Sequence, residues 1–143
     1  PIVQPGMSWF GRTYAIGYEP DLEETLLHRP RRNILADDAD WAVWYPLRRK
    51  PAFALLPDDQ QKAMLAEHGK LGFAFGRSDL ARDVRLACHG LDRDDNDFLI
   101  GLLGASPHPL SELVRRMRAT RHTAEYLDRL GPFFLGRRAW AGP

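Results

Sequence analysis

A short apolar segment, residues 98–103, constrains the fold of this chain more than any other feature. Its residues are apolar at odd and even positions alike, and the preceding residues 90–97 are polar and typical of turns. A strand with one solvent face would alternate apolar and polar residues, so this segment predicts a strand in the middle of a sheet. Both faces of that sheet must then be covered. We expect the second cover from the N-terminal segment, from a partner chain or from both.

Three further segments have strand character: residues 41–47, 83–89 and 133–135. In the second of these, alternation places Arg85 on the face opposite Val84. Pro46 lies inside the first segment. We expect it at an edge or an irregular point of the sheet, because proline has no N–H for a sheet hydrogen bond.

Two helices complete the pattern. One opens at Pro57 with acidic residues in its first turn, and it is expected to end near Gly69 or Gly72. The other is capped by Ser106, and its apolar stripe extends to Arg121. The order strand, helix, strand, strand, helix, strand predicts a ferredoxin-like α+β fold. This is the split βαβ arrangement of a dimeric α+β barrel, with helices on one face of an antiparallel sheet.

The 143 residues fit a single domain. The pattern becomes readable only from about residue 40. We therefore expect residues 1–40 to form an N-terminal extension that packs on a domain of residues 41–143. Within the extension, residues 22–27 predict a short helix, which Pro30 should end.

The charge balance and the single cysteine limit the partners and the compartment. The net charge of +1 gives no overall field that favours nucleic acid or a membrane, and no apolar run approaches the length of a membrane span. We expect neither as a partner. Cys88 alone fits a reducing compartment, so a cytoplasmic location is expected, with the periplasm left open.

His68 carries the most chemical information. It lies on the first predicted helix, and Met64, Leu65, Leu71 and Gly72 share its stripe. A histidine on an apolar stripe stays neutral or finds a partner, because burying its charge is costly. That partner can be an iron atom, although such a histidine is more often a hydrogen-bonded core residue.

Four groups of short motifs occur in order along residues 41–138. They are Trp44-Tyr45-Pro46-Leu47; Phe53 with Leu56-Pro57-Asp58-Asp59 and Glu67-His68-Gly69; Gly90-Leu91-Asp92 with Asp97-Phe98; and Met117-Arg118-Ala119-Thr120 with Pro132-Phe133-Phe134-Leu135-Gly136. Together they resemble the superfamily of chlorite dismutases and coproheme decarboxylases, whereas residues 1–40 carry no such motif. The resemblance implies a ferredoxin-like α+β domain, in agreement with the order of elements above.

The resemblance also implies a cofactor, haem b or coproheme, with His68 as the proximal iron ligand. The residues then expected at the cofactor are His68, Phe53, Met64, Leu65, Arg48 and Leu86. The basic runs at residues 29–32 and 48–50 can hold propionates or can simply be solvated. Family members form dimers or pentamers, so we expect a homodimer, with a pentamer as the alternative.

The distal side departs from the family pattern. Members carry a distal arginine or glutamine on the strand after the proximal helix. Counted from His68, that position is Ala81; aligned on the strand, it falls at Arg85, because the chain has extra residues before Val84. Arg85 is therefore an expected catalytic residue that holds an anionic oxidant, with a solvated strand arginine as the alternative.

The proximal side departs as well. Chlorite dismutases carry a glutamate that polarises the proximal histidine, and Arg121, or His122 when counted from the other end, stands in its place. An arginine cannot accept the imidazole N–H, so the iron would have a weaker electron donor. Tyr45 matches the tyrosine that forms a radical in decarboxylases. It is the second expected catalytic residue, with a packed strand tyrosine as the alternative.

The resemblance implies a haem-dependent oxidoreductase of the chlorite dismutase type. Such an enzyme decomposes chlorite to chloride and dioxygen, or reacts with peroxide, at a histidine-ligated iron. The expected partner is therefore a small anionic oxidant, chlorite or peroxide. Three alternatives stay open: a coproheme decarboxylase-like enzyme of haem synthesis, a non-catalytic protein that binds or senses haem, and a haem-free protein in which His68 is structural.

Overall fold

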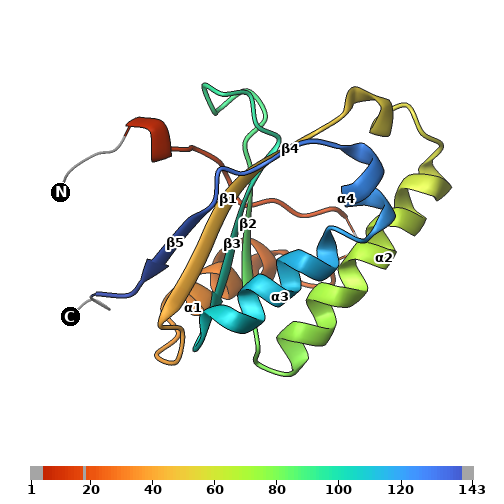
Figure 1. The fold of residues 1–143 in the computed structure, drawn as a ribbon. Helices are drawn as coiled ribbons and strands as arrows, with labels where there is room; N and C mark the ends of the chain where they lie inside the picture. Colours follow the sequence, from red (N-terminus) through yellow and green to blue (C-terminus); the bar gives the residue numbers. More distant parts are fainter. Residues whose placement is uncertain (1–4, 18, 140–143) are drawn as a thin grey trace.

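The computed structural model describes residues 5–17 and 19–139. Figure 1 shows the order of its elements, which are η1 (Pro5–Met7), η2 (Glu24–His28), α1 (Arg29–Ile34), β1 (Trp41–Arg49), η3 (Pro51–Phe53), α2 (Asp58–Arg77), β2 (Arg82–Ala87), β3 (Phe98–Gly104), α3 (Pro107–Met117), α4 (Arg121–Tyr126), β4 (Leu127–Leu130) and β5 (Phe134–Arg137). Within the described residues, no helix combines the length and the apolar character needed to cross a membrane.

The strands form one sheet in which every pairing is antiparallel. The order is β2-β3-β1-β4, and β5 also pairs with β1. Because β3 occupies one edge of β1, β4 and β5 share the other edge. Helix α2 connects β1 to β2, and α3 lies between β3 and β4. The predicted ferredoxin-like α+β fold is confirmed, with β4 as a short additional strand.

Pro46 lies in the middle of β1, which is a central strand and not an edge. On one side, residues 41–44 pair with β5 and residues 47–49 pair with β4. Pro46 falls in the gap between these two neighbours, where its missing N–H leaves no partner unsatisfied. Its carbonyl accepts a hydrogen bond from the backbone N–H of Gly131 at 2.9 Å. The expected irregular point is therefore present, although the expected edge is not.

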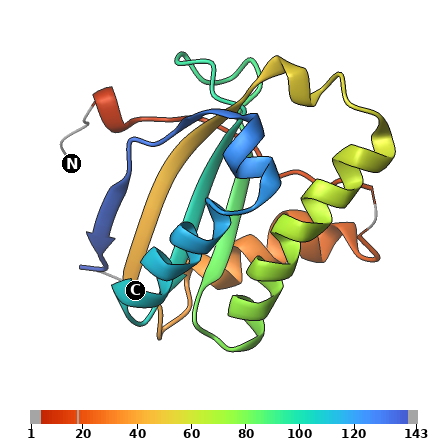
Figure 2. The ribbon, with the colours of Figure 1, turned by 45° about the vertical axis from the view of Figure 1, so that its right-hand side comes forward.

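Strand β3 is the central strand that its apolar sequence predicts, and six of its seven residues are buried. Figures 1 and 2 show α2 and α3 on the same face of the sheet, called here the inner face. The core between them consists of Val43, Tyr45, Phe75, Ala81, Leu102, Leu110 and Leu113. The inner side chains of β1 and β3 follow the two-residue period of a strand.

The outer face of the sheet is covered in part by the chain itself. Val84, Leu103 and Ala39 are buried there, and the Trp44 ring packs against them. Gly101 makes room for this ring, since a Cβ at Gly101 would lie 2.5 Å from two of its carbons. The segment before β1 thus supplies part of the expected second cover. Self-association stays a prediction.

The N-terminal segment docks on the free edge of β2. Arg12 and Ala87 exchange two backbone hydrogen bonds of 2.9 and 2.7 Å. Gly11 approaches so closely that a Cβ there would lie 3.0 Å from the Ala87 carbonyl oxygen. From α1, the Asn33 side chain donates to the Asp83 carbonyl at 2.8 Å. These contacts protect an edge strand that would otherwise present unpaired backbone groups.

Three helix ends differ from those predicted. Helix α2 continues to Arg77, past Gly69 and Gly72. Leu71 and Phe75 extend its core face and outweigh the cost of about 1 kcal/mol for each glycine. Helix α3 ends at Met117, and a turn separates it from α4, so its stripe does not reach Arg121.

The third difference is that Pro30 does not end the N-terminal helix. Arg29 donates its N–H to the Glu24 carbonyl, five residues earlier, in the π-helical segment η2. Pro30 then stands in the first turn of α1, where a missing N–H costs nothing. The predicted boundary between an extension and a domain at residue 40 stays a prediction, and residues 1–4 and 140–143 lie outside the described residues.

Candidate functional site

A cavity of about 510 Å³ lies between the inner face of the sheet and helices α2 and α3, with residues of the η2–α1 segment (Glu24–Ile34) on one side. Much of its wall is apolar, formed by Leu47, Ile100, Leu102, Leu113, Val114, Met117 and Leu130. Its volume and its mainly apolar lining are typical of sites for small molecules or cofactors. Polar and charged side chains, five arginines among them, also line the cavity, and they determine the chemistry of the site.

Three glycines of α2, Gly69, Gly72 and Gly76, line the cavity along one helix face. A Cβ added to Gly69 would meet no atom within 4 Å, and one added to Gly72 would meet only Met117 Cε at 3.8 Å. Side chains at these positions would occupy part of the cavity. Their absence leaves a smooth helix wall that suits a flat ligand.

His68 lies one residue before this glycine strip and also lines the cavity. Its Nδ1 atom is 3.3 Å from the hydroxyl oxygen of Thr120 and 3.5 Å from that of Thr123. The Thr120 hydroxyl donates its own proton to the Met117 carbonyl at 2.7 Å. Thr120 therefore accepts from His68, which assigns the imidazole proton to Nδ1.

The other ring nitrogen of His68, Nε2, therefore carries the available lone pair of the imidazole. Within the described part of the chain, Nε2 has no hydrogen-bond partner. Burial, and then the positive charges of Arg49 and Arg85, lower the pKa of His68 and favour the neutral imidazole. A neutral imidazole with one ring nitrogen fixed and the other free is the form that ligates a metal.

A second histidine, His122, lies beside the first, with the two ring centres 5.4 Å apart. It is only 4% exposed. Its Nε2 accepts a hydrogen bond from Arg49 Nε at 3.0 Å, and its Nδ1 is buried without a partner among the described residues. Burial, together with the charge of Arg49 and the neighbouring His68, lowers the pKa of His122 to about 3.

Tyr45 contributes to the sheet wall of the cavity from β1. Its ring stacks on Phe133 with a centre distance of 4.6 Å, and the residue is buried. Burial raises the pKa of the phenol, with a smaller contribution from Asp83. Tyr45 is therefore a protonated phenol against the cavity, suited to giving up a proton together with an electron and unsuited to acting as a base.

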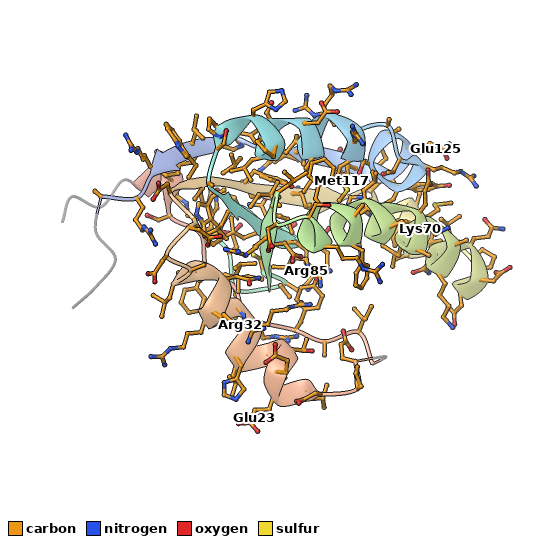
Figure 3. The ribbon with its side chains drawn as sticks, turned by 90° about the horizontal axis from the view of Figure 1, so that it is seen from below. Glu23, Arg32, Lys70, Arg85, Met117 and Glu125 are labelled. Carbon is orange, nitrogen blue, oxygen red and sulfur yellow. The ribbon has the colours of Figure 1, made fainter. Side chains whose placement is uncertain are left out.

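Arg85 reaches the cavity from the edge strand β2, as its predicted strand face requires. Its Nε lies 2.9 Å from an Asp83 carboxylate oxygen, and its guanidinium lies 6.0 Å from the centre of the Tyr14 ring. Tyr14 in turn packs on Phe98 with a ring distance of 5.3 Å. In Figure 3, Arg85 lies between α2 and the η2–α1 segment, which carries Arg32.

Arginines are the commonest charged residues around the cavity. Those that line it are Arg29, Arg32, Arg77, Arg82 and Arg85. Three of them are paired with carboxylates, whereas the other two, Arg29 and Arg77, form no ion pair with any described residue. Guanidinium groups of this kind bind carboxylates and phosphates in a bidentate manner.

The structure brings together His68, Tyr45 and Arg85, but not the other residues expected at a cofactor. Arg48 and Leu86 lie on the outer face of the sheet, because each follows an inner residue of its strand. Arg48 donates to the Asp95 carbonyl at 2.8 Å.

Phe53, Met64 and Leu65 do not line the cavity either. Phe53 and Met64 are buried, and Phe53 packs edge-on against His122. Ala81, the alternative distal position, does line the cavity. Arg121 pairs with Glu125 at 3.0 Å, and its guanidinium cannot accept a hydrogen bond from His68.

Sequence reasoning missed the two threonines that hold His68. Thr120 was part of a recognised motif, but a hydroxyl acceptor for the imidazole was not considered. Tyr14 and Asn33 were missed because nothing in their local pattern indicates contact with β2. A search for hydroxyl residues near the expected glutamate position would have found Thr120 and Thr123.

Comparison with known proteins identifies the family of the chain. The sequence profile of the chlorite dismutase family matches residues 2–139, so the similarity also includes the N-terminal region that carries no recognisable motif. A curated relative is the coproheme decarboxylase of Mycolicibacterium smegmatis, which is 30% identical over 95% of this chain and 61% of the relative.

Solved structures of low sequence identity share the fold. A heme-binding protein from Thermus thermophilus superposes with a TM-score of 0.62 at 23% identity, over 71% of this chain and 41% of the other. Chlorite dismutase from Candidatus Nitrospira defluvii, in complex with imidazole, gives a TM-score of 0.61 at 18% identity, over 82% and 50%. The chain thus spans about three fifths of the curated relative and half or less of these structures. From the profile match over nearly its whole length, this chain belongs to the chlorite dismutase family.

Proposed function

We propose that the cavity binds an iron porphyrin with His68 as the iron ligand, and that the chain acts in the manner of a coproheme decarboxylase. The observation that carries this proposal is the state of His68. Its proton is committed to Thr120 through Nδ1, and Nε2 is left free at the cavity. This is how proteins prepare a histidine for a metal.

The cavity wall fits a porphyrin in shape and polarity. The glycine strip of α2 leaves a flat surface next to His68, and the facing side chains are mostly apolar. Leu47, Ile100 and Met117 would contact the ring system, while the arginines would receive its carboxylates. Coproheme carries four propionates, so the two arginines without a carboxylate partner among the described residues, Arg29 and Arg77, favour it over a less charged porphyrin.

When bound, the iron porphyrin would supply the redox chemistry. In decarboxylation each propionate that reacts loses carbon dioxide, one proton and two electrons and becomes a vinyl group, and one peroxide per reacting propionate can take up the two electrons and form water. The part of this chain is to orient the propionates and to provide Tyr45. Because its phenol is held protonated, Tyr45 can pass a hydrogen atom but cannot act as a carboxylate-like base.

Decomposition of chlorite is the second candidate, and Arg85 is the observation in its favour. A guanidinium on the sheet wall would hold a small anion, such as chlorite, by charge-assisted hydrogen bonds. Two features argue against chlorite decomposition. Asp83 already neutralises part of the Arg85 charge, and His68 is held by neutral hydroxyls that give the iron a weak electron donor.

The test is a titration of the full chain with iron coproporphyrin and with haem b, followed by optical spectroscopy. His68→Ala should lose the histidine-ligated spectrum and more than about 100-fold in affinity, beyond the 10–100-fold typical of residues that only support a ligand. His89→Ala, at an exposed histidine outside the cavity, is the control. An unchanged spectrum in His68→Ala would refute the ligand.

The shape of the site is tested separately. Gly69→Leu should place its side chain in the cavity and weaken binding at least about tenfold, while the fold persists because the new Cβ meets no atom. Lys70→Leu, one residue away at an exposed position, should bind as the parent does.

The reaction is tested by adding peroxide to the bound iron coproporphyrin, and mass spectrometry follows the loss of carbon dioxide. Oxygen release from chlorite without decarboxylation would favour the second candidate.

A further inference from the structure

Arg49 is a half-buried cation with an unusual set of neighbours. Its guanidinium lies 4.7 Å from the centres of both the Phe53 and the Phe98 rings. Among the described residues, no carboxylate forms an ion pair with it, although Asp97 accepts from its backbone N–H at 2.6 Å. Buried charges are normally paired, because desolvation is costly. An unpaired cation here therefore needs a reason.

The only hydrogen-bond acceptor that the described residues offer to the Arg49 guanidinium is an imidazole. Arg49 Nε donates to His122 Nε2 at 3.0 Å. A guanidinium has no lone pair to accept with, so the lone pair of His122 must be on Nε2 and its proton on Nδ1. That Nδ1–H is buried without a partner among the described residues. Leaving a buried donor unpaired costs about 1–3 kcal/mol, which the arrangement tolerates.

The backbone also directs Arg49 to this place. By strand alternation Arg49 lies on the inner face with Tyr45 and Leu47, and the register shift beside it skips Asp128 of β4 and leaves β1 regular. Arg49 therefore points to the side of His122, whose ring centre is 5.4 Å from that of His68. The positive charge of Arg49 is one of the causes that keep His68 neutral.

We propose that Arg49 and His122 are positioning residues that act through His68. They hold a fixed positive charge and a neutral imidazole beside the iron ligand, where a carboxylate would make that ligand more electron-donating. A nearby positive charge favours the ferrous over the ferric state, because the ferrous state carries one positive charge less. The pair therefore raises the reduction potential of the bound iron. This last step rests on the proposed function, whereas the hydrogen-bonded pair itself does not.

The pair is tested first in the full chain without porphyrin. Nitrogen-15 NMR of the imidazoles should give a single Nδ1–H tautomer for His122 in the parent. Arg49→Met, which keeps the length and apolar contacts but removes the charge, should convert it to a mixture of tautomers. Arg49→Lys, which can still donate to Nε2, should restore the parent tautomer. The same His122 tautomer in the Met variant would overturn the pair.

The effect on iron is tested by the midpoint potential of the bound porphyrin. Arg49→Met should shift it to a more negative value, and Arg49→Lys should return it toward the parent. Arg48→Met, a neighbouring arginine on the outer face, should not change it. Equal potentials in the parent and in Arg49→Met would overturn the electrostatic role. A parent that binds no iron porphyrin would overturn the proposed function, and the tautomer measurement would still decide on the pair.

Discussion

The two walls of the cavity are built in different ways. On the helix wall, His68 and the glycine strip follow one another within a single helix, at spacings of one to four residues. On the sheet wall, Tyr45 and Arg85 come from β1 and β2, and Asn33 comes from α1. Tyr14 of the N-terminal segment supports Arg85 from outside the cavity lining. The helix wall therefore depends on local periodicity, and the sheet wall depends on long-range contacts. This difference predicts that binding depends mainly on the first wall and reactivity on the second.

The largest effect is expected on the sheet wall. Arg85→Ala should remove about 2–4 kcal/mol of transition-state stabilisation from turnover of an anionic oxidant, if that donor acts on developing charge. Porphyrin affinity should change little, because the iron ligand is on the helix wall. The measurement compares oxidant turnover and affinity in the variant and the parent, with Arg115→Ala on the exposed side of α3 as the control. A loss of affinity without a loss of turnover would reverse the roles of the two walls.

The next effect is expected on the helix wall. Thr120→Val removes the acceptor of the His68 Nδ1–H and should lower porphyrin affinity about 10–100-fold, as changes around a metal ligand commonly do. Thr123→Val should have a smaller effect, because its hydroxyl is at the longer distance of 3.5 Å. Optical titration of both variants with the porphyrin shows whether Thr120→Val loses more affinity than Thr123→Val. Equal affinities in the two variants and the parent would mean that the hydroxyls do not orient the ligand.

The same difference explains what could be predicted from the sequence. His68 could be identified because its apolar neighbours lie at helical spacing, and β3 because both of its faces are apolar. The partner of His68 could not, since Thr120 is 52 residues away and meets it only when α2 and α4 pack. Arg85 could be assigned to a strand face by alternation. Its contact with Tyr14 requires the N-terminal segment to dock on β2, and no local sequence pattern indicates this docking.

Two residues expected at the cofactor do not line the cavity. Arg48 was expected there as part of a basic run that can hold propionates, and Leu86 because it follows Arg85 on the strand, and their role at a cofactor stays a prediction. In a strand, a neighbour in sequence points to the opposite face, so both lie on the outer side of the sheet. The end of α2 was misplaced for the converse reason. Its glycines favour termination locally, but the burial of Phe75 in the core extends the helix.

A pH effect on stability is expected from His122 in the chain without porphyrin. Its pKa is lowered to about 3, chiefly by burial, whereas an imidazole in the unfolded chain takes up a proton near pH 6.5. Between about pH 6.5 and pH 3, the unfolded chain therefore binds more protons than the folded one. The contribution of His122 is complete above this window, and about 1.4 kcal/mol should be lost for each pH unit below about 6.5.

Denaturant unfolding at about pH 7.5 and about pH 5.5 measures this loss. His122→Phe should have a smaller dependence on pH than the parent, because it removes the group that takes up the proton on unfolding. His108→Asn, at an exposed position on α3, should keep the parent dependence. Identical slopes in the parent and in His122→Phe would mean that His122 is not held neutral by its burial beside Arg49.

The smallest effect tests how the N-terminal segment is attached to the sheet wall. A Cβ at Gly11 would lie 2.9 Å from Leu86 Cβ and 3.0 Å from the Ala87 carbonyl oxygen, so Gly11→Ala must displace the segment from β2. We expect a loss of about 1 kcal/mol, at the lower end of the cost of overpacking, because one methyl group is added at an edge. Gly6→Ala is the matched control, since a Cβ there meets nothing within 4 Å. The measurements are the free energies of unfolding of both variants and the rate of proteolysis of their N-terminal segment. Equal stability and equal proteolysis in the two variants would mean that the segment is not held by its contact with β2, and the sheet wall would then lose Tyr14 as a support for Arg85.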